Sequence, residues 1–290
     1  MVPFTGVEEF GLSAEELAIA TAKIMELRQV HISFNIDTSN SHQPECPARI
    51  RRAYELLEEY GLARRCKRTE ARVATRDELL RVHDADYVDL IEQTSRLSQA
   101  DLNEAGSHSY DSAVLAVGSL LSVVDDICNY EALYGVAVIR PPGHHAEKDS
   151  CAGFCFFNNV ALAVRHTQEI HGRKRIAIVD WDVHHGNGIQ HEFEEDPSVL
   201  YISLHRFDDG KFFPGSQDAA AAAAGTGAGK GKTANLPWNS RPVRDGDYIA
   251  AVMHFVLPLL YEFRPELTFI AAGFDAARGD HLLLSPDYCL

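Results

Sequence analysis

A short stretch in the middle of the chain concentrates residue types that bind metals. In "VDWDVHHGNG", residues 179–188, two aspartates and two histidines lie within six positions, directly after a run of β-branched residues. In an extended chain, residues two apart face the same way, so Asp180, Asp182 and His184 should share one side. Carboxylate and imidazole groups suit Zn²⁺. The stretch is therefore a candidate zinc site. The alternative is that these side chains cap a strand end or are satisfied polar groups of the core.

A catalytic zinc site needs a third protein ligand and one position left open for water. Asp275, in "GFDAARGD" at the end of another apolar run, is the natural candidate for that ligand. Because Asp182, His184 and Asp275 already supply three protein ligands, the adjacent His144 and His145 of "RPPGHHAEKD" need a role other than metal binding. Histidine can act as base and acid in hydrolysis near neutral pH. Asp180 and Asn187 are available to orient the two imidazole rings.

The elements that must position these residues are short apolar runs alternating with helical patterns. Ligands of open parallel sheets bind beyond the carboxyl ends of the strands, so polar residues at several strand ends indicate one shared site. We expect an α/β fold, a three-layer domain with a mainly parallel sheet flanked by helices. The expected strands lie within 135–139, 175–180, 199–204 and 267–275, and the expected helices within 49–62, 75–94, 112–129, 158–171 and 247–263.

The composition is that of an ordinary intracellular globular protein. The chain has 290 residues, 46% of them hydrophobic, and a formal net charge of −15. That charge argues against nucleic-acid binding, which needs clustered lysine and arginine. The six cysteines show no framework spacing, so we expect reduced thiols. We find no secretory signal and no apolar run long enough to span a bilayer, and expect a protein of the nucleus, the cytoplasm or both, without a membrane partner.

We expect two parts in the chain. Residues 1–30 form a leader, in which 13–27 have the capping-box register and apolar spacing of an amphipathic helix. Residues 31–290 form the catalytic domain. Within it, the alanine- and glycine-rich segment 218–232 is predicted to be a flexible surface loop.

Four motifs, in order, resemble the catalytic domain of the class II (Hda1-like) zinc-dependent histone deacetylases, which have the arginase–deacetylase fold. They are "RPPGHHAEKDSCAGFCFFNNVALA", "VDWDVHHGNG", "DPSVLYISLHRFDDGKFFPG" and "AAGFDAARGD", and the resemblance runs from about residue 31 to 280. It implies hydrolysis of the acetyl-lysine amide to lysine and acetate. Acetylated histone tails or other acetyl-lysine proteins are the implied substrates, and corepressor proteins the implied partners.

The resemblance also implies roles for single residues. The implied zinc ligands are Asp182, His184 and Asp275. His145 resembles the general base and acid of the family, and Asn187 matches the class II residue that faces this histidine. His144, beside Asp180, resembles the electrostatic partner.

Two further sets of residues follow from the same resemblance. A structural monovalent cation, usually potassium, is implied at Asp180, Asp182, His184, Ser203 and Leu204. The tunnel that takes the acyl-lysine is implied at Gly153, Phe154, Phe213 and Leu282.

The chain departs from the family pattern in three places. The family uses a tyrosine in a Gly-Gly-Tyr turn to donate a hydrogen bond to the oxyanion, and no such turn follows "GFDAARGD" before Leu290. Gln43 stands where the family usually has histidine, and the segment after "SHSYDS" (107–112) is shorter than usual. The fold is thus expected to lack its last elements, which would expose a sheet edge, lower stability and impair turnover.

Two other functions remain open on the same residues. One is an amidohydrolase of the acetylpolyamine type, since specificity depends on the rim of the site, which is altered here. The other is a non-catalytic zinc-binding corepressor scaffold, which the absent tyrosine favours and the His144–His145 pair disfavours. A binuclear manganese enzyme of the same fold would need more acidic and histidine ligands.

Overall fold

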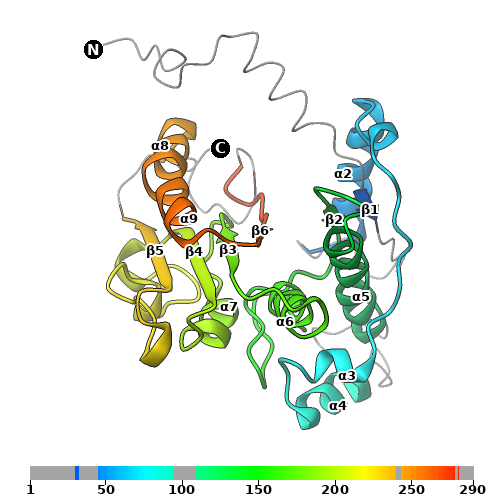
Figure 1. Cartoon of the computed structure of the whole chain (residues 1–290), viewed down its shortest axis with the longest axis horizontal. Coiled ribbons are helices and arrows are strands. Elements are labelled where there is room, and N and C mark those ends of the chain that lie inside the picture. Colours follow the sequence, from blue (N-terminus) through cyan, green and yellow to red (C-terminus); the bar gives the residue numbers. More distant parts are fainter. Residues whose placement is uncertain (1–29, 33–44, 95–108, 240–242, 278–279, 281–290) are drawn as a thin grey trace.

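The computed structural model describes residues 30–32, 45–94, 109–239, 243–277 and 280 (Figure 1). Its strands are β1 (Val30–Ile32), β2 (Val136–Val138), β3 (Ile176–Asp180), β4 (Val199–Arg206), β5 (Thr233–Trp238) and β6 (Leu267–Ala271). Its α-helices are α2 (Pro47–Glu59), α3 (Arg76–Leu79), α4 (Ala85–Thr94), α5 (Ser109–Cys128), α6 (Asn159–His171), α7 (Asn187–Phe193), α8 (Asp245–Ala251) and α9 (Leu257–Phe263). A π-helical turn (Val252–Val256) joins α8 to α9. The expected leader helix at 13–27, Gln43 and Leu282 lie outside the described residues.

The main sheet has four parallel strands in the order β5-β4-β3-β6. Its central strand β3 ends at Asp180, which pairs in register with Ser203 of β4 and with Ala271 of β6. Within the described ranges, β2 pairs only with β1, in a separate two-stranded parallel sheet. The prediction of mainly parallel strands is therefore confirmed, but the strand that precedes the histidine pair is not hydrogen-bonded to the main sheet.

Helices cover both faces of the main sheet. Every residue of β3 and β4 is buried, as in parallel strands packed on both sides. Ile176 and Ile178 of β3 pack in a core with α5, α6 and α7. Ala177 and Val179 face the opposite way and pack in a second core with α8 and α9. Figure 1 shows α8 and α9 on one side of the strands and α7 on the other, which gives the three expected layers.

Three of the described strands and α-helices, β1, β5 and α7, were not predicted from the sequence. Strand β5 contains Pro237 and lies at one edge of the sheet, where a missing backbone donor is tolerated. Helix α7 follows the metal-binding stretch directly. The alanine- and glycine-rich segment is a loop, but it is packed: the Thr226 amide donates to the Glu194 carbonyl oxygen at 2.7 Å. A Cβ at Gly229 would lie 2.4 Å from that same oxygen, so this glycine serves close backbone packing, which the prediction of a flexible loop did not foresee.

Among the helices that the structure describes, none combines the length and the apolar character needed to cross a bilayer. The cysteines of the described residues, at 46, 66, 128, 151 and 155, are all free thiols.

Leu162→Ala is expected to lower the free energy of unfolding by about 2–5 kcal/mol, because it removes buried methyl groups and leaves a cavity. Leu162 lies in α6, is 1% exposed and belongs to the core between α5 and the sheet. Ile170→Ala is the matched control, since Ile170 lies on the same helix and is 57% exposed. It should change stability by less than about 0.5 kcal/mol. Urea unfolding measures both variants, and equal losses would contradict the described core.

Candidate active site

The chain turns sharply after β3, and this turn gathers the metal-binding residue types. Strand β3 ends at Asp180, and residues 182–184 form bends rather than extended chain. The prediction that alternation in an extended chain would align the three side chains is therefore wrong beyond Asp180. Instead, an oxygen of Asp180 accepts from the Asp182 amide at 3.2 Å, and Oδ1 of Asp182 accepts from the His184 amide at 2.8 Å. Each carboxylate thus holds the backbone amide of the residue two positions further along the chain.

The three predicted zinc ligands do converge. His184 Nδ1 lies 3.1 Å from Asp182 Oδ1 and 2.8 Å from Asp275 Oδ2, and the three ligand atoms lie within 4.8 Å of one another. The other oxygen of Asp275 accepts from the Val183 amide at 2.9 Å, which holds this carboxylate in place. Gly273 allows the close approach, because a Cβ there would lie 1.9 Å from Asp182 Oδ2.

The charges of this cluster suit a cation at its centre. Burial opposes protonation of His184, but the Asp182 and Asp275 carboxylates outweigh burial and raise its pKa to about 9. Burial likewise acts to raise the pKa of Asp182, but the neighbouring His144 and His184 lower it below its usual value. The proton on His184 thus lies between two carboxylates. Two carboxylate oxygens and one imidazole nitrogen are a donor set that fits zinc, which would displace that proton.

His144 forms a buried pair with Asp180. Its Nδ1 lies 3.0 Å from Asp180 Oδ2, which also accepts from the Tyr201 hydroxyl at 3.2 Å. Burial disfavours the charged imidazole, but the Asp182 and Asp180 carboxylates outweigh it and raise the pKa of His144 to about 9. The two carboxylates thus favour the charged form of His144, next to the metal-binding cluster.

The pKa of His145 is shifted in the opposite direction from that of His144. Burial and the neighbouring His144 lower its pKa to about 2, so its imidazole is neutral. Its Nδ1 lies 2.8 Å from Asn187 Oδ1. The Asn187 amide nitrogen donates to Glu147 Oε1 at 2.5 Å, which fixes the amide so that its oxygen faces the ring. Since that oxygen can only accept, Nδ1 carries the proton and Nε2 has a free lone pair. His145 is thus held in the tautomer that a general base needs.

Several residues that support the site were missed by sequence reasoning. Glu147 holds Asn187 and also accepts from His191 Nδ1 at 2.9 Å. Its position two residues after the histidine pair could have indicated it. Tyr201 supports Asp180 from the neighbouring strand, and its even spacing from Ser203 was the available signal. No local signal pointed to Phe212, whose ring stacks on His184 with a centroid distance of 5.0 Å.

His185 is not part of the metal-binding cluster. It is fully buried, and its Nε2 lies 2.8 Å from Gln190 Oε1. Burial, followed by the nearby His205, lowers the pKa of His185 to about 3.

Two of the residues predicted to line a tunnel, Gly153 and Phe213, lie next to His145. Phe213 meets His145 edge-on at a centroid distance of 4.9 Å, and a Cβ at Gly153 would lie 2.4 Å from His145 Cδ2. Phe154 and Phe213 are 43% and 46% exposed, so both rings are available for contact. Leu282 lies outside the described residues.

Of the residues predicted to hold a monovalent cation, Asp180, Ser203 and Leu204 lie on the adjacent strands β3 and β4, and Asp182 and His184 lie in the bends after β3. Asp180, Ser203 and Leu204 are fully buried, and Asp180 and Ser203 are register partners. The Ser203 hydroxyl makes a 2.8 Å hydrogen bond with His205 Nδ1.

The chain is similar to known proteins over most of its length. A family model described as "Histone deacetylase domain" matches residues 43–284. The chain is 45% identical over 251 residues to polyamine deacetylase HDAC10 of Homo sapiens, which covers 82% of this chain and 37% of that protein. It is 40% identical over 279 residues to histone deacetylase 15 of Arabidopsis thaliana, which covers 95% of this chain and 50% of that protein.

A solved structure has the same arrangement. The crystal structure of the HDA15 HD domain matches with a TM-score of 0.82 at 40% identity, covering 90% of this chain and 75% of that one. The chain spans half or less of the length of the two curated relatives.

Proposed function

Because the chain belongs to the histone deacetylase family, in its class II (Hda1-like) group, we propose that it hydrolyses the acetyl-lysine amide of proteins, histone tails among them. The products are lysine and acetate. The observation that carries this proposal is the placement of two buried histidines, His144 held by Asp180 and His145 held by Asn187, beside the Asp182–His184–Asp275 cluster. Such a pair supplies a base and a positive charge next to a metal-binding group.

The family is zinc-dependent, and we propose that Asp182, His184 and Asp275 hold the zinc ion in this chain. Bound there, zinc would supply polarisation of the acetyl carbonyl and acidification of a water molecule. His145 takes the proton of the attacking water at Nε2, because its Nδ1–H is engaged with Asn187. The same Nε2 then gives that proton to the departing lysine amine. His144 stabilises developing negative charge through its own positive charge, which Asp180 maintains.

Further parts of the proposal concern the surroundings of the site. We propose that Asp180 and Ser203, with Asp182, His184 and Leu204, hold a structural potassium ion beneath the zinc site. We propose that Phe154 and Phe213, with Gly153, line the path of the acyl-lysine. We also propose that the protein binds corepressor proteins and is located in the nucleus, the cytoplasm or both. The chain is proposed to consist of a leader at 1–30 and a catalytic domain at 31–290.

A second candidate function is the hydrolysis of acetylated polyamines. It is favoured by the 45% identity to a protein named polyamine deacetylase. The same base and metal ligands would act on either amide, so only the substrate differs.

A direct comparison separates these functions. The zinc-loaded chain is incubated with an acetyl-lysine histone peptide and with an acetylpolyamine, and free acetate is measured. We expect faster release from the peptide. Faster release from the polyamine would favour the second candidate, and zinc binding without release from either would favour a non-catalytic scaffold.

Gly153→Ala is expected to lower kcat/KM on the peptide by roughly tenfold or more, because the added Cβ would displace the His145 ring from its reacting position. The matched control is Gly172→Ala. Both glycines have positive φ, +51° and +65°, so both variants have a similar backbone cost, but at Gly172 nothing lies within 4 Å of the added Cβ. Equal kcat/KM values in two folded variants would contradict the placement of His145 against Gly153.

A further inference from the structure

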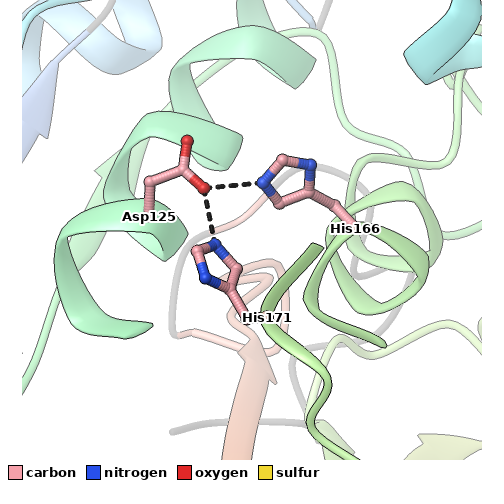
Figure 2. Close-up of side chains that lie close together, drawn as sticks. All are labelled: Asp125, His166 and His171. Carbon is pink, nitrogen blue, oxygen red and sulfur yellow. Dashed lines mark hydrogen bonds and ion pairs between the residues drawn. The ribbon is translucent and has the colours of Figure 1, made fainter. Parts of the chain in front are cut away.

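A second group of acid and histidine side chains lies between two helices, away from the strand ends. Asp125 is in the last turns of α5, and His166 and His171 are in α6. Figure 2 shows both imidazole rings directed at one carboxylate. His166 Nε2 lies 2.6 Å and His171 Nε2 lies 2.8 Å from the same oxygen, Asp125 Oδ1. Within the described ranges, this group and the Asp182–His184–Asp275 cluster each bring three ligand atoms within 4.8 Å of one another.

The geometry of this group resembles that of the candidate active site. Ligand atoms around a tetrahedral zinc ion lie roughly 3.3 Å apart, given zinc–ligand distances of about 2.0–2.2 Å. The separations are 2.6 and 2.8 Å here and 2.8 and 3.1 Å in the candidate active site. In both clusters, therefore, the ligand atoms would have to move apart by a similar small distance to admit a zinc ion. Two imidazoles and one carboxylate are also a recognised ligand set for zinc, with a fourth position left for water.

The group is accessible from one side. The side chain of Asp125 is 35% exposed, whereas those of His166 and His171 are 6% and 12% exposed. An ion could therefore enter past the carboxylate and meet two largely buried imidazoles. His171 is the last residue of α6, and the left-handed Gly172 directly after it ends the helix.

Arg81 opposes a metal in this place. Its Nη1 donates to His166 Nδ1 at 2.8 Å, so the proton of the neutral ring stays on Nε2, the atom that faces Asp125. A metal on Nε2 needs the other tautomer, with the proton on Nδ1, where it would meet the arginine donor. Arg81 has a second partner outside the group, because its Nε lies 2.9 Å from Glu169 Oε2. The guanidinium can therefore release His166 and remain paired.

We propose that Asp125, His166 and His171 form a second site for a divalent metal of the zinc class, which links α5 to α6, and that Arg81 lowers its affinity. This site is independent of the proposed catalytic zinc site, since it shares no residue with it.

The test is a titration of Zn²⁺ alone into the full chain by calorimetry, after the chain has been loaded with one equivalent. We expect a second equivalent to bind. Asp125→Asn replaces a charged ligand by a neutral amide and His171→Ala removes a ligand, so each should weaken binding of this second equivalent at least about tenfold. The matched control is Asp126→Asn, which removes the same charge from the neighbouring position, where the carboxylate binds Thr69 instead.

Arg81→Gln tests the proposed opposition by Arg81. An amide oxygen can accept from His166 Nδ1–H, so this variant should bind the second equivalent about tenfold more tightly.

A spectroscopic measurement keeps the result independent of folding defects. In ¹H–¹⁵N spectra of the imidazoles, Zn²⁺ should remove the proton from Nε2 of His166 and His171 and shift both ¹⁵N resonances. Binding of only one equivalent by the parent chain would overturn the proposal. So would a second equivalent that Asp125→Asn and His171→Ala both leave unchanged.

Discussion

Asp275→Asn is expected to lower the zinc affinity of the chain by at least about 100-fold and to abolish measurable deacetylation, because it replaces a charged ligand by a neutral amide. The change is nearly isosteric, and the asparagine oxygen can still accept from the Val183 amide, as the aspartate does at 2.9 Å. The fold should therefore survive, and the loss should lie in the metal. Zinc content after dialysis against a weak chelator measures the first effect, and acetate release measures the second.

The control is Asp245→Asn, an exposed acid at the start of α8, which should leave zinc content and turnover unchanged. If Asp275→Asn retained a full equivalent of zinc at the same affinity, this carboxylate would not be a ligand, and the assignment of the metal-binding cluster would be wrong.

His145→Ala is expected to lower kcat by about 10²–10⁴-fold while zinc content stays at the parent level, because the variant removes the base and no proposed ligand. A loss of kcat without a loss of zinc would distinguish a catalytic role of His145 from a role in metal binding. His145 donates through Nδ1 to Asn187 and leaves Nε2 free, so its loss removes the group that accepts the proton of the attacking water. A variant that lost zinc and activity together would show a structural role instead.

His254→Ala serves as the control for the loss of an imidazole, because His254 is exposed in the π-helical turn on the far face of the sheet from α6. It should leave kcat unchanged. A His145→Ala variant with a kcat within about twofold of the parent would remove His145 from the mechanism.

The residue types at the strand ends carried most of what could be predicted. Asp182, His184 and Asp275 come together because the carboxyl ends of parallel strands meet at one edge of the sheet, and β3 and β6 are adjacent there. Buried β-branched runs likewise predicted β3 and β4 with their bounds nearly correct, since a strand covered on both faces has little room for polar residues.

What could not be predicted depends on contacts between distant segments. The bends at 182–184 are held by hydrogen bonds from backbone amides to carboxylates, which the alternation of residue types does not indicate. The support of Asn187 by Glu147 joins residues 40 positions apart. Asp125 lies 41 positions from His166, and only the packing of α5 on α6 brings the two together. No motif marks that group.

The most direct test of the central claim is X-ray diffraction at the zinc absorption edge from crystals of the zinc-loaded chain. The anomalous map should place a zinc ion within about 2.0–2.2 Å of Asp182, His184 Nδ1 and Asp275, with Nε2 of His145 facing the open side of the ion. A fully loaded crystal with no anomalous peak at those three side chains would contradict the account.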